Sequence, residues 1–362
     1  MAKICFSVLL IILASCAHTP KIRHTDFADV KPVNELKRLC IGGSYQWVMI
    51  RGQNPNNPVL LFLHGGPGTS EMPLLRYFNK DLEKYYTVVM WDQRGAGKSN
   101  YKATPDETFS LNQILDDTYE VTQYLKKRFS QPKIFLVGHS WGSILGILTV
   151  KEHPEDYYAY VGVGQVVNAK KNLQVSYDTI NKLALMTNSK KEITKFAQFE
   201  ISRNINGDIL LKDAIKMYSW IERNARVFYE KNGHYQLTKA TALAPEFTIR
   251  DKAGYLPGIY RSKRLLWNDQ FLSINFMTSA NQLDVPVYFV QGTHDFITCA
   301  DVTKEYVDAI SAPHKEMVLF DKSAHCPIFE EPKKFNELLI TNVRKHSVSQ
   351  PIAKDITVHA TH

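Results

Sequence analysis

Residues 138–142 read GHSWG, which matches the pattern G-x-S-x-G. The run stands between an apolar stretch at 134–137, typical of a buried strand, and a helical pattern at 143–153. A serine on a tight turn between a strand and a helix presents its hydroxyl at the end of the sheet, and the flanking glycines allow close backbone approach. The pattern therefore predicts Ser140 as a nucleophile; the alternative is a serine that only caps the following helix.

A serine hydroxyl is a weak nucleophile until a base takes its proton, and that base must be oriented by a carboxylate. In elbows of this kind the chain order is Ser, then Asp or Glu, then His. Asp295 follows an apolar run at 285–290, and His325 follows another at 317–320. Open α/β sheets bind ligands at the carboxyl ends of such strands. The sequence thus predicts Asp295 as the acid and His325 as the base.

Two other histidines are rivals for the base. His294 adjoins Asp295 and does not follow a strand of its own. His139 adjoins Ser140, and adjacent side chains in a turn seldom meet. Both features favour His325.

The oxyanion of an acyl-transfer intermediate needs two backbone donors. One is expected at the amide after the nucleophile, Trp141. The other is expected in the HGGPG loop at 64–68, which follows an apolar run at 59–63. Glycines there let the backbone approach the oxyanion; the alternative is a simple glycine turn.

Apolar runs alternate with helical patterns over much of the chain, which predicts an α/β fold with a mostly parallel sheet flanked by helices. The expected strands are 44–50, 59–63, 87–91, 134–137, 160–163, 285–290 and 317–320, and the expected helices are 111–129 (capped by Ser110), 143–153, 300–310 and 332–345. Residues 168–267 are helical in character without buried-strand runs, which indicates an inserted helical cap.

The first residues differ from the rest. Lys3 precedes an apolar run at 4–13 that is too short to span a bilayer and is typical of a secretory signal. LASC at 13–16 resembles a bacterial lipobox, which predicts lipidation at Cys16 and attachment to a membrane of the bacterial cell envelope, on its periplasmic or extracellular face. An ordinary signal peptide with a chance cysteine is the alternative.

These patterns divide the chain into five parts. We expect a lipoprotein signal peptide at 1–15, a tether at 16–40, a core at 41–167 and 268–346, a helical cap at 168–267 and a flexible tail at 347–362.

Composition excludes other classes. Lys and Arg exceed Asp and Glu by 44 to 36, but the basic residues are scattered without the aromatic-interleaved stripe of a nucleic-acid binder. GKS at 97–99 resembles the end of a phosphate-binding loop, yet Asp92 stands where that loop needs glycine.

Cys40, Cys299 and Cys326 form no zinc pattern. Free thiols are expected, and one disulfide among them remains an alternative. No metal or cofactor is expected, and no oligomeric state is predicted.

Three segments together resemble the prolyl iminopeptidase family of α/β-hydrolases: HGGPG at 64–68, WDQRGAGKS at 91–99 and GHSWG at 138–142. The resemblance implies an α/β-hydrolase fold with a helical cap. It also implies a catalytic triad of Ser140, Asp295 and His325, oxyanion donors at Gly66 and Trp141, and a structural ion pair between Asp92 and Arg94.

The resemblance implies an aminopeptidase that releases an N-terminal proline or small residue of a peptide through an acyl-enzyme. Family members bind the substrate's amino group with cap glutamates, and Glu222 is the nearest candidate here. A carboxylesterase or lipase-like hydrolase of small or lipid-like esters is the alternative, which an apolar cap would favour. An inactive, surface-anchored binding protein is the alternative of another class.

Overall fold

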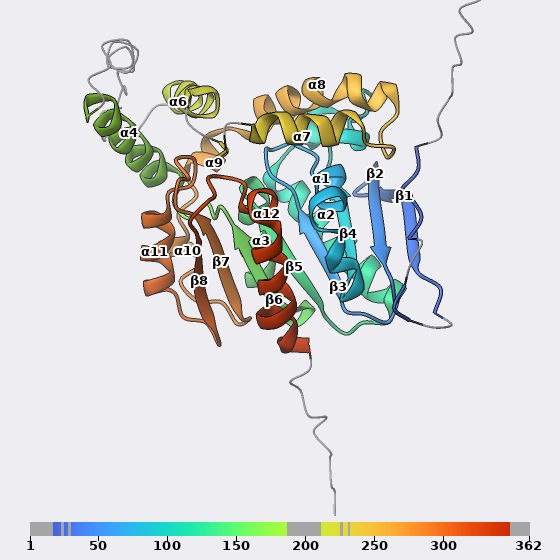
Figure 1. Ribbon diagram of the computed structural model, residues 1–362. Coiled ribbons are helices and arrows are strands. Elements are labelled where there is room, and N and C mark those ends of the chain that lie inside the picture. The colour runs from blue at the N-terminus through green and yellow to red at the C-terminus, as the bar shows by residue number, and fades with distance from the viewer. Residues whose placement is uncertain are drawn as a thin grey trace, which may run out of the picture.

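The computed structural model of the chain describes residues 17–22, 25–27, 30–186, 211–224, 227–230 and 232–347. These residues form an eight-stranded sheet in the order β1-β2-β4-β3-β5-β6-β7-β8 (Figure 1). The strands are β1 (Val33–Ile41), β2 (Ser44–Gly52), β3 (Val59–Leu63), β4 (Thr87–Asp92), β5 (Ile134–His139), β6 (Tyr157–Val163), β7 (Val287–Gly292) and β8 (Lys315–Phe320). Only the pairs β1–β2 and β2–β4 are antiparallel, so the prediction of a mostly parallel sheet is confirmed.

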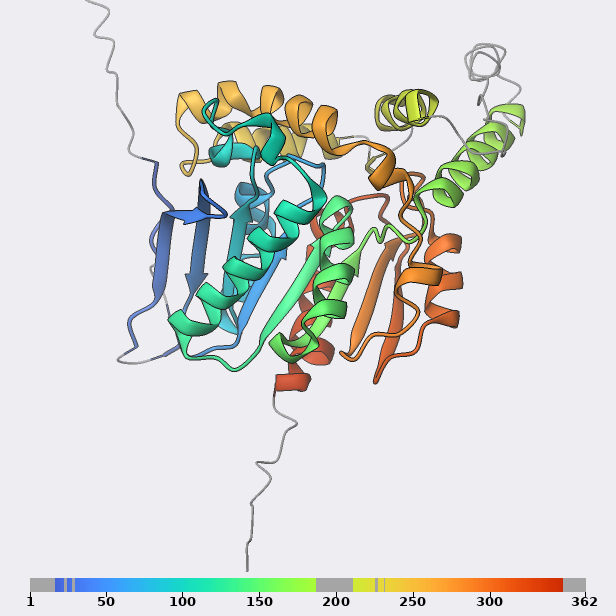
Figure 2. The same ribbon diagram turned by 180° about the vertical axis from the view of Figure 1, so that it is seen from behind.

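Helices cover both faces of the sheet (Figures 1 and 2). α2 (Leu111–Phe129), α3 (Trp141–Glu152) and α11 (Ala300–Ala309) pack against one face, and α1 (Met72–Phe78), α12 (Pro327–Glu330) and α13 (Pro332–Leu338) against the other. In β3, Leu61 belongs to the first core and Leu60 and Phe62 to the second. The strands are therefore continuous apolar runs because both of their faces are buried.

Most elements lie where the sequence predicts them. α2 has the predicted bounds, and the Ser110 side chain accepts a hydrogen bond from the Gln113 N–H at 3.1 Å. The helix after Ser140 begins at Trp141, two residues earlier than expected. The predicted final helix is α-helical only to Leu338. A π-helical turn at Leu339–Val343 and a 3-10 turn at Arg344–Ser347 follow it.

The expected tether at 16–40 needs correction, because it contains most of β1. This strand pairs with β2 from Val33 to Ile41. It lies at the sheet edge and is only half-buried, so it lacks the apolar run by which the inner strands are recognised. Arg51 of β2 also binds the segment that precedes β1. It donates to the Thr19 hydroxyl at 2.6 Å and to the Pro20 carbonyl at 2.5 Å.

Between β6 and β7 the described chain is helical, in the region where the sequence predicts a cap. It forms α4 (Ala169–Met186), α6 (Leu211–Asn224), α7 (Gly233–Ala242), α8 (Ile249–Leu266), α9 (Asp269–Leu272) and α10 (Phe276–Ser279). Thr248 and Asp251 form a capping box that starts α8. α7 and α8 lie over the carboxyl ends of the parallel strands β3 and β5 (Figure 1).

Several predictions fall outside the described residues: the signal at 1–15, the lipidation site Cys16, the side chain of Glu222, and the tail at 348–362. Across the described ranges, no helix has the length and apolar character needed to cross a membrane.

Candidate active site

Ser140 lies on a tight turn between β5 and α3, with φ 51° and ψ −115°. A positive φ is strained for a residue with a side chain, and such strain is typical of functional sites. A Cβ added at Gly138 would lie 2.4 Å from the Gly142 carbonyl oxygen, and one at Gly142 would lie 2.1 Å from the Leu63 carbonyl oxygen. Both flanking positions therefore require glycine, which is the steric reason for the G-x-S-x-G pattern.

The structure brings the three residues of the predicted triad together. His325 Nε2 lies 2.9 Å from Ser140 Oγ, and His325 Nδ1 lies 2.9 Å from Asp295 Oδ2. Asp295 follows β7, and His325 follows β8, so the two strand ends place both side chains beside the elbow. This geometry lets His325 accept the serine proton while Asp295 fixes the other ring nitrogen.

Asp295 is held as a carboxylate. The backbone N–H groups of Ile297 and Thr298 donate to its Oδ1 at 2.8 and 3.0 Å, and the Thr298 hydroxyl donates to Oδ2 at 2.6 Å. Burial alone would raise the pKa of Asp295, but the interaction with His325 and the hydrogen bonds from Thr298 outweigh it and hold that pKa below its usual value.

The HGGPG loop lies directly against Ser140. A Cβ added at Gly65 would lie 3.2 Å from Ser140 Cβ, and Gly66 has a φ of 118°. Gly66, Ser140 and Trp141 line the same cavity. The two predicted oxyanion donors, Gly66 and Trp141, thus share this cavity with the serine, and their catalytic role stays a prediction.

A buried acid that the sequence did not single out, Glu71, lines the same cavity as Ser140. Glu71 Oε1 is 2.5 Å from His139 Nδ1 and accepts the Gly65 N–H at 3.2 Å. His139 Nε2 lies 2.8 Å from the backbone carbonyl oxygen of His325. Glu71 and His139 therefore connect the HGGPG loop, the turn at Ser140 and the loop that carries His325. No motif marks Glu71; its position shortly after HGGPG is the one available signal.

His294, the rival base, lies elsewhere. Its ring packs against Tyr229 with 4.7 Å between the ring centroids, while His325 holds the hydrogen bond to Ser140.

The expected ion pair between Asp92 and Arg94 is wrong. Arg94 donates from Nε and Nη2 to the two carboxylate oxygens of Asp117 on α2, at 3.0 and 2.9 Å. Asp92 instead accepts the Lys98 N–H at 2.8 Å and a hydrogen bond from the Ser70 hydroxyl. The chain turns sharply after β4, so Asp92 faces its own loop and Arg94 faces the neighbouring helix.

A cavity of about 650 Å³ opens over the serine, between the core and the cap. Its walls are mostly apolar and aromatic, with Leu74, Val166, Tyr218, Trp267, Phe271 and Phe329 among the residues that line it. Among the described lining residues Glu71 carries the one carboxylate, and the cap contributes Lys252 and Lys263. The cavity therefore suits a small, partly apolar substrate.

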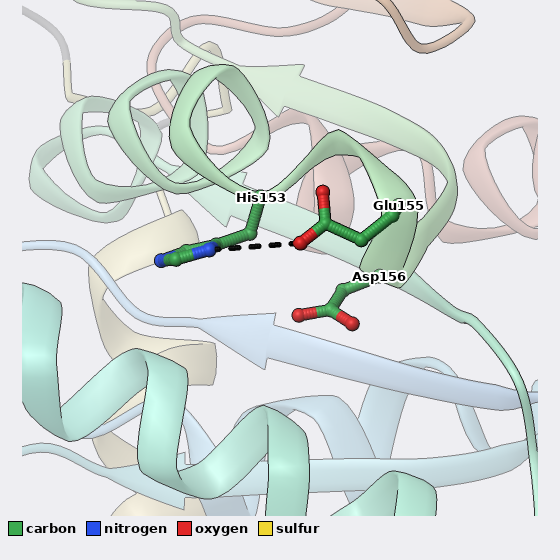
Figure 3. Close-up of side chains that lie close together, drawn as sticks. All are labelled: His153, Glu155 and Asp156. Atoms are coloured by element: carbon green, nitrogen blue, oxygen red, sulfur yellow. Dashed lines mark ion pairs between the residues drawn. The ribbon is translucent and has the colours of Figure 1, made fainter.

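One group of possible metal ligands occurs among the described residues, formed by His153, Glu155 and Asp156 (Figure 3). Asp156 already binds Lys126 and the Gln123 amide, and Glu155 is exposed. The group follows the carboxyl end of α3, whereas Ser140 precedes its amino end. We assign no metal to it.

The three described cysteines are free thiols, with Cys299 and Cys326 buried and Cys40 exposed. Burial raises the pKa of Cys299 to about 12 and that of Cys326 to about 11, so both are unreactive thiols at neutral pH.

Comparisons with known proteins agree with this architecture. Residues 58–184 match the family model described as "alpha/beta hydrolase fold". The chain is 35% identical over 321 residues to "Probable aminopeptidase YbaC" of Bacillus subtilis, which covers 88% of this chain and 99% of that protein. It is 32% identical over 156 residues to a proline iminopeptidase of Arabidopsis thaliana, covering 43% of this chain and 39% of that one.

Among solved structures, a proline iminopeptidase of Mycobacterium smegmatis superimposes with a TM-score of 0.64 at 18% identity, covering 87% of this chain and 99% of that one. At this identity the likeness supports the fold.

Proposed function

The chain belongs to the α/β-hydrolase family, among relatives named aminopeptidase and proline iminopeptidase, and from that premise we propose that it is a serine hydrolase that releases the N-terminal residue of small peptides. The hydrogen-bonded chain from Ser140 through His325 to Asp295, at the floor of a cavity, carries the proposal. The relative that matches over nearly its whole length supports the peptide substrate.

In the proposed reaction Ser140 Oγ attacks the carbonyl carbon of the scissile amide while its proton passes to His325 Nε2. The carbonyl oxygen becomes an oxyanion that the Gly66 and Trp141 N–H groups stabilise. The C–N bond then breaks, and the leaving amine takes the proton from His325. Water, deprotonated by the same histidine, attacks the resulting ester and frees Ser140.

A second candidate is an esterase for small or lipid-like esters. The walls of the cavity favour it, because the described cap residues that line it include two lysines and no carboxylate. A cationic amino group needs an anionic partner once it leaves water. Glu71 lines the cavity and is already bound to His139, so the described cap residues of this lining offer an amine no anionic partner.

The two candidates separate in one assay. Hydrolysis of proline p-nitroanilide is compared with that of p-nitrophenyl butyrate, with Ser140→Ala as the control. Turnover of the anilide by the wild type but not by Ser140→Ala supports the aminopeptidase. Turnover of the ester alone supports the esterase. Equal activity of wild type and Ser140→Ala on both substrates contradicts the serine mechanism.

We further propose that Cys16 is lipidated and holds the enzyme on a membrane of the cell envelope. The lipobox-like LASC at 13–16 supports this placement. Metabolic labelling with palmitate should give a labelled protein that Cys16→Ser abolishes; labelling that persists in the variant contradicts it.

A further inference from the structure

The outer side of α7 and α8 exposes many large apolar side chains. Of the nine large hydrophobic residues exposed in the described part of the chain, five lie within 26 positions: Tyr235, Leu243, Ile249, Leu256 and Tyr260. Concentrations of this kind mark interaction sites more often than scattered apolar residues do.

On α8 these residues form one stripe. Ile249, Leu256 and Tyr260 are seven and four positions apart, which places them on the same side of a helix with 3.6 residues per turn. They are 82%, 60% and 71% exposed. A helix normally buries such a stripe against its own core, so this one is available to an external apolar phase.

The charge of the same segment is positive. Residues 233–266 contain six Lys or Arg, of which Arg261 and Arg264 pair with Asp106, and two acids, Glu246 and Asp251. Glu246 is buried against Arg76, and Asp251 is paired with Lys98 at 2.7 Å. Arg250 is exposed beside Ile249, and Lys239 lies over the ring of Tyr235. An apolar stripe edged by cations is typical of a helix that lies on an anionic membrane surface.

The amino-terminal segment of the chain reaches this same surface. The His18 N–H donates to the Pro245 carbonyl at 3.1 Å, in the turn between α7 and α8. The described segment before β1 therefore lies beside the turn that precedes α8, as both views show (Figures 1 and 2). Leu243 and Ile249, two of the exposed residues, flank this turn.

The stripe also borders the opening of the active-site cavity. Leu256 and Ala242 are exposed and line the cavity from α8 and α7. A flat apolar phase against this side would therefore lie next to the opening.

From these observations we propose that the outer face of α7 and α8, comprising Tyr235, Leu243, Ile249, Leu256 and Tyr260, docks onto an anionic lipid bilayer and turns the active-site opening toward it. The docking needs no lipid on Cys16, but the two act together, since stable attachment usually takes two signals. It also stands apart from the proposed reaction, because binding to lipid does not depend on Ser140.

The test uses full-length chains that all carry Cys16→Ser, so that no lipid is attached. Co-sedimentation is measured with vesicles of phosphatidylethanolamine and phosphatidylglycerol, and with vesicles of phosphatidylcholine alone. The test variant is Ile249→Glu with Tyr260→Glu, neither of which lines the cavity. The matched control is Tyr119→Glu with Leu319→Glu, which are 40% and 45% exposed on other elements.

We expect the test variant to bind phosphatidylglycerol vesicles roughly tenfold more weakly than the control, and the control to bind phosphatidylcholine more weakly than phosphatidylglycerol. Turnover of a water-soluble substrate should be equal in the two variants, which shows that both are folded. Equal vesicle binding by the two variants would overturn the proposal, because residues 4–13 or another surface would then hold the protein on the lipid. Binding that is indifferent to phosphatidylglycerol would overturn its electrostatic part.

Discussion

Glu71 Oε1 lies 2.5 Å from His139 Nδ1, and the two buried side chains form an ion pair that lines the same cavity as Ser140. His139 Nε2 faces a carbonyl oxygen, which can only accept, so that nitrogen carries a proton. Glu71 Oε1 also accepts the Gly65 N–H. A carboxylate at Glu71 and a doubly protonated imidazole at His139 satisfy all three contacts together.

The pKa of His139 reflects this arrangement. Burial works to lower it, but the interactions with the Glu71 carboxylate and with Cys326 together outweigh burial and raise the pKa of His139 well above its ordinary 6.5. A raised histidine pKa contributes stability that is complete below 6.5 and is lost as the pH rises through the folded-state value. The contribution of the pair therefore disappears on the alkaline side.

Glu71→Gln should accordingly move the alkaline limb of the pH–activity profile to lower pH. A neutral amide leaves the buried imidazole without its counter-charge, so His139 loses its proton earlier. We expect kcat/KM at pH 8 to fall ten- to a hundredfold, about the value of one charge-assisted hydrogen bond, roughly 1.5–3 kcal/mol.

The matched control for that variant is Glu83→Gln. Glu83 is also a buried carboxylate in an ion pair, with Arg51 at 2.6 Å, but it is remote from the cavity lining. The substitution Glu83→Gln should lower the free energy of unfolding without moving the pH–activity profile. If both variants leave the alkaline limb where it is in the wild type, the pair does not position the active site.

Asp295→Asn should lower kcat by about 10³–10⁴-fold with little change in KM, because an amide can hold His325 in the wrong tautomer and cannot stabilise the imidazolium. Steady-state kinetics on the better of the two chromogenic substrates measures the effect. A loss of less than tenfold would remove Asp295 from the proposed triad.

Asp92→Asn should change how stability depends on pH. Burial raises the pKa of Asp92 to about 7, whereas the unfolded chain releases this proton near 3.8. The native state thus holds more protons between these values, and wild-type stability falls as the pH rises through that window. The asparagine does not titrate. The free energy of unfolding of the variant, relative to that of the wild type, should therefore rise between pH 4 and pH 8 by up to about 4 kcal/mol, at about 1.36 kcal/mol per pKa unit. Urea denaturation at both pH values measures this; parallel pH dependences would contradict it.

Arg94→Ala should cost about 3–5 kcal/mol of unfolding free energy, because it leaves the Asp117 carboxylate buried without its cation. The double variant Arg94→Met, Asp117→Leu should recover much of that loss, since it removes both charges. A double variant less stable than Arg94→Ala would contradict this, because the attraction between the two side chains would then exceed the free-energy cost of burying both charges.

The sequence predicts Ser140, Asp295 and His325 because each follows a strand whose buried apolar run is visible in the chain. The elbow is recognisable for a steric reason, since both of its glycines are required by close contacts with the backbone. These are local features, and the spatial meeting of the three residues then follows from the order of the strands.

Contacts between distant segments were not predictable in the same way. Asp117 lies inside a helix pattern, and nothing in the sequence connects it with Arg94. Glu71 carries no motif and acquires its role only where α1 begins beside His139. β1 lacks an apolar run because it is an edge strand, and the residues that line the cavity from the cap depend on how its helices pack.

The central claim, that Ser140 is the nucleophile, is tested most directly by mass spectrometry after treatment with a fluorophosphonate, which phosphonylates activated serines. We predict one adduct per chain, located on the peptide that contains Ser140, and its loss in His325→Ala. An enzyme that turns over substrate while Ser140 remains unmodified, with the adduct elsewhere or absent, would contradict the account.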